Sequence, residues 1–199
     1  MTKIPKIIHY CWVGGNPKPQ SVLYCIESWK RCCPDYEIRE WNETNYDFTK
    51  NEYMRQAYEA KKWGFVPDYA RLDIVYEHGG IYLDTDVEMV RSFDELLEHE
   101  SFFGFEDTGD GEFFVNCGHG FGAVAGHEAI RRARDLYEQV FPSGGWHSES
   151  AGVSLLHHPG TAAAGPGSGE PGSASSRRPG LRLRRTVPQE FPNRQADED

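Results

Sequence analysis

The 199-residue sequence predicts an α/β domain, in which a sheet is covered by helices on both faces, followed by a C-terminal tail without a core. Segments with strand and helix patterns alternate over residues 1–142, as expected for such a sheet. Two turns, Gly14-Gly15 and Asp84-Thr85-Asp86, follow predicted strands. In α/β sheets, ligands bind at the carboxyl ends of the strands, so these turns are the first places to look for a site.

Hydrophobic periodicity and turn residues place the elements along the chain. The predicted strands are Ile4–Val13, Tyr36–Trp41, Phe102–Glu106, Glu112–Asn116 and Gly120–Ala125. The predicted helices are Ser21–Cys33, which Pro34 stops, Asn51–Trp63 and Glu128–Phe141. A further helix and strand over residues 66–88 complete the alternation.

The stretch Val66–Glu88 carries the most chemical information. Pro67 suits the first position of a helix, because its missing N–H would have no partner there. Gly79 suits the left-handed residue that ends many helices. The strand that follows alternates between faces, with Ile81 and Leu83 on one face. The other face then carries Tyr82, Asp84, Asp86 and Glu88.

Asp84 and Asp86 would therefore point the same way at the end of a strand. Two facing carboxylates repel each other unless a positive charge compensates them. A hard divalent cation, Mg²⁺ or Mn²⁺, would do so and would also clamp a diphosphate. The pattern alone is weak, since Asp197-Glu198-Asp199 also matches it, and a solvated acidic turn is the alternative.

Two segments, IPKIIHYCWVGG and VPDYARLDIVYEHGGIYLDTDVE, resemble a known family over about residues 3–141. It is the DXD-containing glycosyltransferase family of bacterial capsular-polysaccharide sugar transferases. The yeast initiating mannosyltransferase and the glucosyltransferase domains of the large clostridial toxins look related. The resemblance implies a GT-A fold and the retaining transfer of a hexose from a nucleotide sugar. The donor would be a UDP-hexose or GDP-mannose, and the acceptor a saccharide or glycolipid in capsular polysaccharide biosynthesis.

The resemblance also implies roles for three residues outside the acidic turn. Trp12 matches the aromatic residue that stacks on the nucleotide base, and a core tryptophan at a strand end is the alternative. Asp68 and Arg71 match a motif whose aspartate contacts the ribose or sugar and whose arginine contacts the sugar or phosphate. Because they lie three residues apart on a helix, they could equally pair with each other.

By the same resemblance, Tyr82 would lie beside the nucleotide, although a plain sheet-face residue is the alternative. Asp84 would contact the ribose or donor sugar, and the metal through water. Asp86 would bind the metal directly, and these two aspartates are the candidate catalytic residues. Glu88 lies outside the motif and is interpreted as a solvated charge.

Composition limits the partners and the location. A formal net charge of -10 argues against a nucleic-acid partner. No segment approaches the ~18 apolar residues of a membrane span, and the N-terminus does not look like a signal peptide. Five cysteines without framework spacing are typical of reduced thiols. We therefore expect a cytoplasmic protein. A peripheral position at the inner face of the membrane would also agree with this composition.

The composition changes abruptly after Pro142, which divides the chain into a domain at 1–142 and a tail at 143–199. The tail has no lysine and is rich in Gly, Pro, Ser, Ala and Arg, so we expect it to be disordered. A reading-frame shift or a natural flexible linker would each produce this change. The family's closing segment, often His followed by Ser-Trp, is not found, and Trp146-His147-Ser148 has another order.

Other functions also fit parts of the sequence. Without that closing segment, a non-catalytic nucleotide-sugar-binding remnant is the main alternative. A haloacid-dehalogenase-type phosphohydrolase would need Thr or Val where Glu88 stands. Asn116 and His119 lie on a glycine-rich loop where an acceptor could bind, although a structural loop is the simpler interpretation. No carboxylate is clearly placed as a nucleophile, which favours a front-face mechanism. Asp107, Asp110 and Glu112 are in reach by their sequence position alone.

Overall fold

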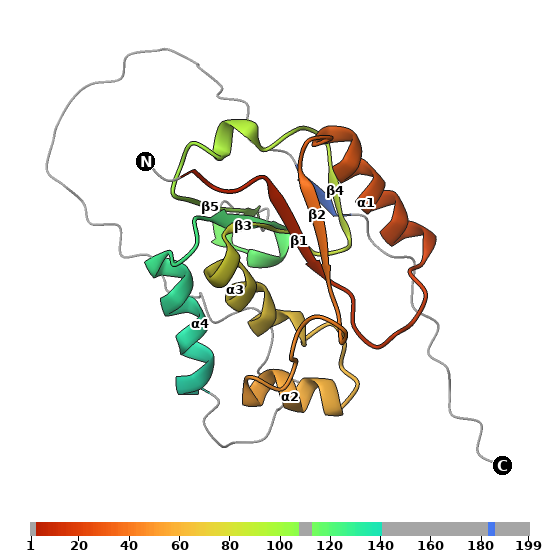
Figure 1. Ribbon diagram of the computed structural model, residues 1–199, viewed down its shortest axis with the longest axis vertical. Helices are drawn as coiled ribbons and strands as arrows, with labels where there is room; N and C mark the ends of the chain where they lie inside the picture. The colour runs from red at the N-terminus through yellow and green to blue at the C-terminus, as the bar shows by residue number, and fades with distance from the viewer. Residues whose placement is uncertain (1–2, 108–112, 141–182, 186–199) are drawn as a thin grey trace, which may run out of the picture.

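The computed structural model describes residues 3–107, 113–140 and 183–185 (Figure 1). Its strands are β1 (Ile7–Cys11), β2 (Glu37–Trp41), β3 (Gly80–Tyr82), β4 (Val87–Met89), β5 (Ser101–Phe103), β6 (Phe105–Asp107), β7 (Phe113–Val115), β8 (Phe121–Ala123) and β9 (Leu183–Arg185). Its α-helices are α1 (Gln20–Cys32), α2 (Glu52–Glu59), α3 (Pro67–His78) and α4 (Glu128–Val140). The predicted alternation of strands and helices is confirmed.

The main sheet has five strands in the order β2-β1-β3-β8-β5. β1 runs parallel to both of its neighbours, with Ile8 opposite Ile38 of β2 and Ile81 of β3. β8 is antiparallel to β3 and to β5, so the sheet is mixed. Because β1 and β3 are parallel neighbours, their carboxyl ends lie at the same edge of the sheet. The segments that follow Cys11 and Tyr82 therefore leave the sheet side by side.

Helices cover the sheet on both faces, as predicted (Figure 1). On one face, α1 buries Trp29 against Ile8, Ile81 and Leu83. On the other face, α2, α3 and α4 pack around a second core that includes Tyr82. Ile81 and Tyr82 thus point to opposite faces, as the period of two requires for β3.

Helix α3 lies at the centre of the second core. Pro67 occupies its first turn and Gly79 ends it with a φ of 65°, so both predicted ends are confirmed. Every residue from Asp68 to Val75 is buried, so the helix is enclosed on more than one face. The helix lies against the sheet and also contacts α2 and α4, and so it has little solvent-facing surface.

Three predicted elements differ clearly in extent, the first being the strand predicted over Ile4–Val13, which spans only Ile7–Cys11. Helix α2 ends at Glu59 rather than Trp63, since Lys61 adopts a φ of 55° that a helix cannot continue through. The strand predicted over Phe102–Glu106 is two strands, which pair with β8 and β7 respectively. Periodicity alone does not show where a chain changes its pairing partner.

Three residues of the tail, Leu183–Arg185, form the strand β9. β9 pairs antiparallel with β4, with Arg185 opposite Val87 and Leu183 opposite Met89. The backbone hydrogen bonds of β4 are partly met by this pairing, which low-complexity composition gives no reason to expect. The domain boundary at 142 and the Trp146-His147-Ser148 segment lie outside the described residues. Across the described residues, no helix combines the length and apolarity needed to cross a bilayer.

A neutral histidine links the centre of the sheet to α3. His9 on β1 accepts a hydrogen bond at Nδ1 from the Trp41 indole Nε1, at 3.1 Å. Its Nε2 therefore carries the proton and donates to the carbonyl of Gly79, at 2.8 Å. Burial lowers the pKa of His9 from 6.5 to about 4, although the Gly79 carbonyl opposes the shift. The imidazole is fully hydrogen-bonded only in its neutral form.

We predict that His9 makes stability depend on pH between 6.5 and 4. The unfolded chain binds a proton in this window and the folded chain does not, so the free energy of unfolding falls as the pH falls. The loss attributable to His9 between pH 7 and pH 5 is roughly 2 kcal/mol. Urea unfolding of wild type and His9→Gln at both pH values measures it, with the exposed His99→Gln as control. An equal pH dependence in wild type and His9→Gln would contradict the prediction.

Candidate functional site

The two motif aspartates lie in a turn rather than on a strand. β3 ends at Tyr82, and the buried Leu83 makes one more backbone bond, to the carbonyl of His9 at 3.1 Å. The chain then turns through Asp84-Thr85-Asp86, and the N–H of Val87 donates to the carbonyl of Asp84 at 3.2 Å. The predicted alternation therefore holds through Leu83, which shares a core with Ile81, and is wrong from Asp84 onward. The turn, and not the pleat, determines how the carboxylates are placed.

Arg71 joins two carboxylates from different elements. Its Nη2 donates to Asp68 on the same helix, and its Nη1 lies 3.4 Å from Oδ2 of Asp84 in the turn. Its Nε donates to the carbonyl of Pro67 at 3.1 Å. The side chain is only 5% exposed. The helical pairing of Asp68 with Arg71, weighed as an alternative, is present, and Arg71 supplies part of the positive charge that Asp84 requires.

Burial makes this charge cluster sensitive to its partners. Burial raises the pKa of Asp68 to about 6, while Arg71 and a hydrogen bond from Tyr53 oppose that rise. The Tyr53 hydroxyl donates to Oδ2 of Asp68 at 3.0 Å. Burial by itself would lower the pKa of Arg71, but Asp84 and Asp68 outweigh it and hold that pKa well above its usual range. Arg71 therefore stays charged, and Asp68 depends on Arg71 and Tyr53 to stay ionised.

Tyr82 lies behind this cluster. Its side chain is 1% exposed, and the guanidinium of Arg71 lies 5.5 Å from its ring centroid.

Two thiols that sequence reasoning did not select lie near the same cluster. Burial raises the pKa of Cys11 to about 12 and that of Cys117 to about 11, so both stay protonated at neutral pH. No sequence pattern marked these cysteines or Tyr53, because only the fold brings them to the acidic turn.

The glycine-rich loop that carries Asn116 and His119 is stabilised by a side-chain hydrogen bond to its own backbone. Asn116 is buried, and its Oδ1 accepts the N–H of Gly118 at 2.8 Å. That bond caps the short 3-10 turn Cys117–His119, and His119 is half-buried. The structural interpretation of this loop thus has a physical basis. Asp110 and Glu112 lie outside the described residues.

Trp12 lies just past the end of β1. Its backbone N–H donates to the carbonyl of Trp41 at 2.9 Å, and its indole Nε1 donates to the carbonyl of Asn16 at 2.7 Å. The side chain is half-buried and packs against the core on the α1 face of the sheet. Gly14 follows with a φ of 91°, and a Cβ there would lie 2.7 Å from the Trp63 ring. Only glycine fits this close approach.

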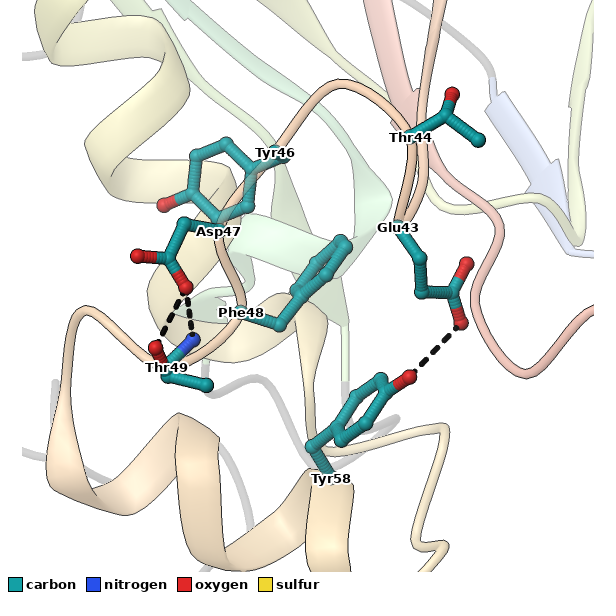
Figure 2. Close-up of a pocket in the computed structure, with 7 residues that line it drawn as sticks. All are labelled: Glu43, Thr44, Tyr46, Asp47, Phe48, Thr49 and Tyr58. Carbon is teal, nitrogen blue, oxygen red and sulfur yellow. Dashed lines mark hydrogen bonds between the residues drawn. The ribbon is translucent and has the colours of Figure 1, made fainter.

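A hollow of about 450 Å³ adjoins this turn (Figure 2). Glu43 belongs to both, since its Oε1 accepts the Gly14 N–H at 2.6 Å and the Tyr58 hydroxyl at 3.4 Å. Figure 2 shows the bond between Glu43 and Tyr58 at the rim of the hollow, and Asp47 turned toward Thr49. None of the residues predicted from the sequence lines this hollow. It is lined by Glu43, Thr44, Tyr46, Asp47, Phe48, Thr49 and Tyr58.

Helix α1 holds the far end of the acidic turn. The fully buried Trp29 donates from Nε1 to the carbonyl of Val87 at 2.8 Å. The Ser28 hydroxyl accepts the N–H of Met89 at 2.9 Å and donates to the carbonyl of Cys25 at 2.6 Å. Side chains of α1 thus satisfy backbone groups of β4 where the main sheet does not. The turn is fixed by α3 at its start and by α1 at its end.

The donors at the turn suit a hard divalent cation. Within the part of the chain that the structure describes, no group of three or more His, Cys, Asp or Glu side chains forms a complete metal cage. Mg²⁺ is often held by one or two carboxylates, with water and substrate phosphates supplying the rest. Asp84 and Asp86 offer such a set, and Asp84 remains 23% exposed.

We predict that the hydroxyl of Tyr53 stabilises the ionised form of Asp68. Tyr53→Phe removes a hydrogen bond to a buried charge, which we expect to lower the free energy of unfolding by about 2 kcal/mol at pH 7. Tyr58→Phe on the same helix is the matched control, because its hydroxyl makes only a 3.4 Å contact with exposed Glu43. Its effect should stay within about 0.5 kcal/mol. Urea unfolding measures both, and equal effects would contradict the prediction.

The comparisons with known proteins agree with this geometry. Residues 19–103 match the family model described as "Glycosyltransferase sugar-binding region containing DXD motif". The chain is 35% identical over 104 residues to inositol phosphoceramide mannosyltransferase 3 of Schizosaccharomyces pombe, covering 48% of this chain and 28% of that protein. It is 28% identical over 113 residues to inositol phosphoceramide mannosyltransferase 1 of the same organism, covering 51% of this chain and 34% of that protein. The chain thus spans about a third of these curated relatives.

A solved structure supports the fold. The structure of PaToxG glycosyltransferase matches with a TM-score of 0.56 and 19% identity, covering 79% of this chain and 66% of that one. At this identity the match shows the fold alone, and that fold is GT-A. The matched residues include α3, β3 and the acidic turn, whose geometry is described above. Residues 19–103 of this chain are therefore similar to the glycosyltransferase sugar-binding regions that contain the DXD motif.

Proposed function

We propose that this chain carries the nucleotide-sugar site of a metal-dependent, retaining glycosyltransferase, which moves a hexose to a saccharide or glycolipid acceptor. One observation carries the proposal: the Asp84-Thr85-Asp86 turn and the Trp12 loop leave the same edge of the sheet, after the parallel strands β3 and β1. A nucleotide diphosphate can then extend from an aromatic platform to a carboxylate-bound cation. The family match over residues 19–103 supports this interpretation.

The residues of the site would divide the work between binding and support. Trp12 would stack on the base, a contact worth ~1–3 kcal/mol. Asp84 and Asp86 would hold Mg²⁺ or Mn²⁺, which supplies neutralising charge for the diphosphate as it becomes the leaving group. Arg71 would keep the Asp84 carboxylate oriented from behind.

Asp68 and Tyr82 complete that support. Direct contact of Asp68, Arg71 or Tyr82 with the nucleotide sugar stays a prediction. Their burial favours a supporting role, because all three side chains are less than a tenth exposed. Supporting residues that fix a carboxylate reduce the disorder that ligand binding must overcome.

The named relatives bear on the sugar and the acceptor. Both Schizosaccharomyces pombe proteins are by name mannosyltransferases of inositol phosphoceramide, which is a lipid. This supports GDP-mannose as the first donor to test and a lipid-linked acceptor as the first acceptor, ahead of a capsular polysaccharide. UDP-hexoses remain in the proposal because the acidic turn itself does not discriminate between nucleotides.

We also propose that retention proceeds on the front face of the sugar, with the leaving phosphate acting as base. A double displacement needs a carboxylate held on the far face. Of the three acidic residues considered from the sequence, Asp110 and Glu112 lie outside the described residues. Asp107 ends β6, which pairs with β7 and not with the main sheet. The front-face route requires no such residue.

A second candidate is a nucleotide-sugar-binding module that does not turn over by itself. It is supported by the partial coverage of the relatives, of which the chain spans 28% and 34%. Binding and turnover must therefore be measured separately. The two candidates share the same site and differ only in whether the bound nucleotide sugar is turned over.

We predict that Asp86→Ala abolishes metal-dependent nucleotide binding. In a calorimetric titration of the protein with UDP or GDP in the presence of Mn²⁺, the affinity for the nucleotide should fall roughly 100-fold or more, because a direct metal ligand is removed. Glu88→Ala is the matched control, since it removes a nearby carboxylate that accepts a bond from Tyr24 instead.

Turnover is measured in the same proteins as nucleotide release from UDP-glucose, UDP-galactose, UDP-N-acetylglucosamine and GDP-mannose, with and without Mn²⁺. Release that requires Mn²⁺ and disappears in Asp86→Ala supports the transferase. Metal-dependent binding without release supports the binding module. Metal-dependent release that survives Asp86→Ala would contradict the assignment of the site.

A further inference from the structure

We propose that Lys18 and Glu40 are positioning residues that hold the Trp12 indole in place before a nucleotide binds. The inference rests on the proposed function of Trp12 as the platform for the base. Neither residue belongs to the acidic turn or to the helix motif. They lie on the segment before α1 and on β2, and they meet at Trp12.

Lys18 lies over the indole ring. Its ammonium nitrogen is 5.7 Å from the ring centroid of Trp12 and 2.7 Å from Oε2 of Glu40. The two charged side chains are only 22% and 29% exposed. A cation over an indole face is attracted by the ring, and more strongly when it is partly removed from water. The carboxylate prevents the ammonium from leaving that face.

Glu40 is itself held in place by the sheet. Oε2 accepts a hydrogen bond from the Tyr10 hydroxyl at 2.5 Å, and Oε1 accepts one from Nδ2 of Asn42 at 3.1 Å. Burial opposes ionisation of Glu40, but the bonds from Lys18, Tyr10 and Asn42 outweigh it and lower its pKa. Tyr10 is buried on β1, where its ring packs edge-on against Trp29 at 5.6 Å. The carboxylate is thus a fixed charge.

The backbone restricts Lys18 as well. It stands between Pro17 and Pro19, and each proline limits its own φ and the conformation of the residue before it. Pro19 has an extended conformation, with φ -66° and ψ 161°. The lysine stem therefore begins from a restrained position, and less conformational entropy is lost when the ammonium is held.

The indole is also fixed at its edge, by the bond from Nε1 to the carbonyl of Asn16. A ring held at one face by Lys18 and at one edge by Asn16 keeps its orientation while it remains partly exposed. A platform ordered in advance loses less entropy when a base stacks on it. The expected consequence is tighter binding of any nucleoside, whether or not it carries phosphate.

The competing explanation is that Lys18 contacts the phosphates of the nucleotide directly. The two explanations separate when uridine and guanosine are compared with UDP and GDP. A positioning residue affects the nucleoside and its diphosphate by the same factor. A phosphate-binding lysine affects the diphosphate alone.

The test uses Lys18→Met, Lys18→Arg and Glu40→Gln, with Lys30→Met as the control. Met keeps the stem and removes the charge, and Lys30 is an exposed α1 lysine paired with Glu27. The mobility of the Trp12 indole N–H is read by NMR relaxation in the ligand-free protein, with Trp12→Phe assigning the signal. Affinities for the two nucleosides and the two diphosphates are measured by titration.

We expect greater indole mobility in Lys18→Met and Glu40→Gln, and affinities that fall roughly three- to tenfold for nucleoside and diphosphate alike. Lys18→Arg keeps the positive charge, so its indole mobility and its affinities should stay close to those of wild type. Unchanged indole mobility in Lys18→Met would overturn the proposal, as would a loss confined to the diphosphates. If Trp12→Ala leaves affinity unchanged, the role of Trp12 in the proposed function fails, and the mobility measurement still decides whether Lys18 and Glu40 hold the ring.

Discussion

The buried guanidinium of Arg71 is the constraint on which the site depends. It lies between Asp68 of α3 and Asp84 of the acidic turn, and a buried charge of this kind is costly unless its partners stay in place. Tyr53 extends the cluster to α2 through its bond to Asp68. Helix, turn and neighbouring helix must therefore keep one relative arrangement. That requirement explains why a motif that suggests surface chemistry lies against the core.

Contacts from other elements fix the remaining parts of the site in a similar way. Trp29 and Ser28 of α1 take the backbone groups of β4, so the turn cannot move away from the sheet at its far end. At the neighbouring strand end, Trp12 is held by backbone bonds and by Lys18. The two segments that follow β3 and β1 are thus fixed by separate sets of contacts. Their closeness follows from the parallel pairing of β1 and β3.

Much of the architecture was predictable because it follows from local patterns. The positions of α1, α3 and α4 agree with the apolar periodicity and with the residues at their ends, such as Pro67 and Gly79. The faces of Ile81 and Tyr82 follow from the pleat of a strand. The same reasoning failed at Asp84 and Asp86, because the strand ends at Tyr82. Where pairing ends depends on the neighbouring strands, and a single segment does not contain that information.

The sequence by itself determined the α/β class, the acidic pair and the aromatic residue after the first strand, because these depend on residue types and short spacings. Only the tertiary structure decided that Arg71 faces inward, that Tyr53 bonds to Asp68, and that Lys18 lies over Trp12. These contacts join residues from different elements. The tertiary structure also pairs Leu183–Arg185 with β4, although the composition of that segment does not predict a strand. Such partners are selected by the packing of the whole sheet and its helices, which local spacing does not encode.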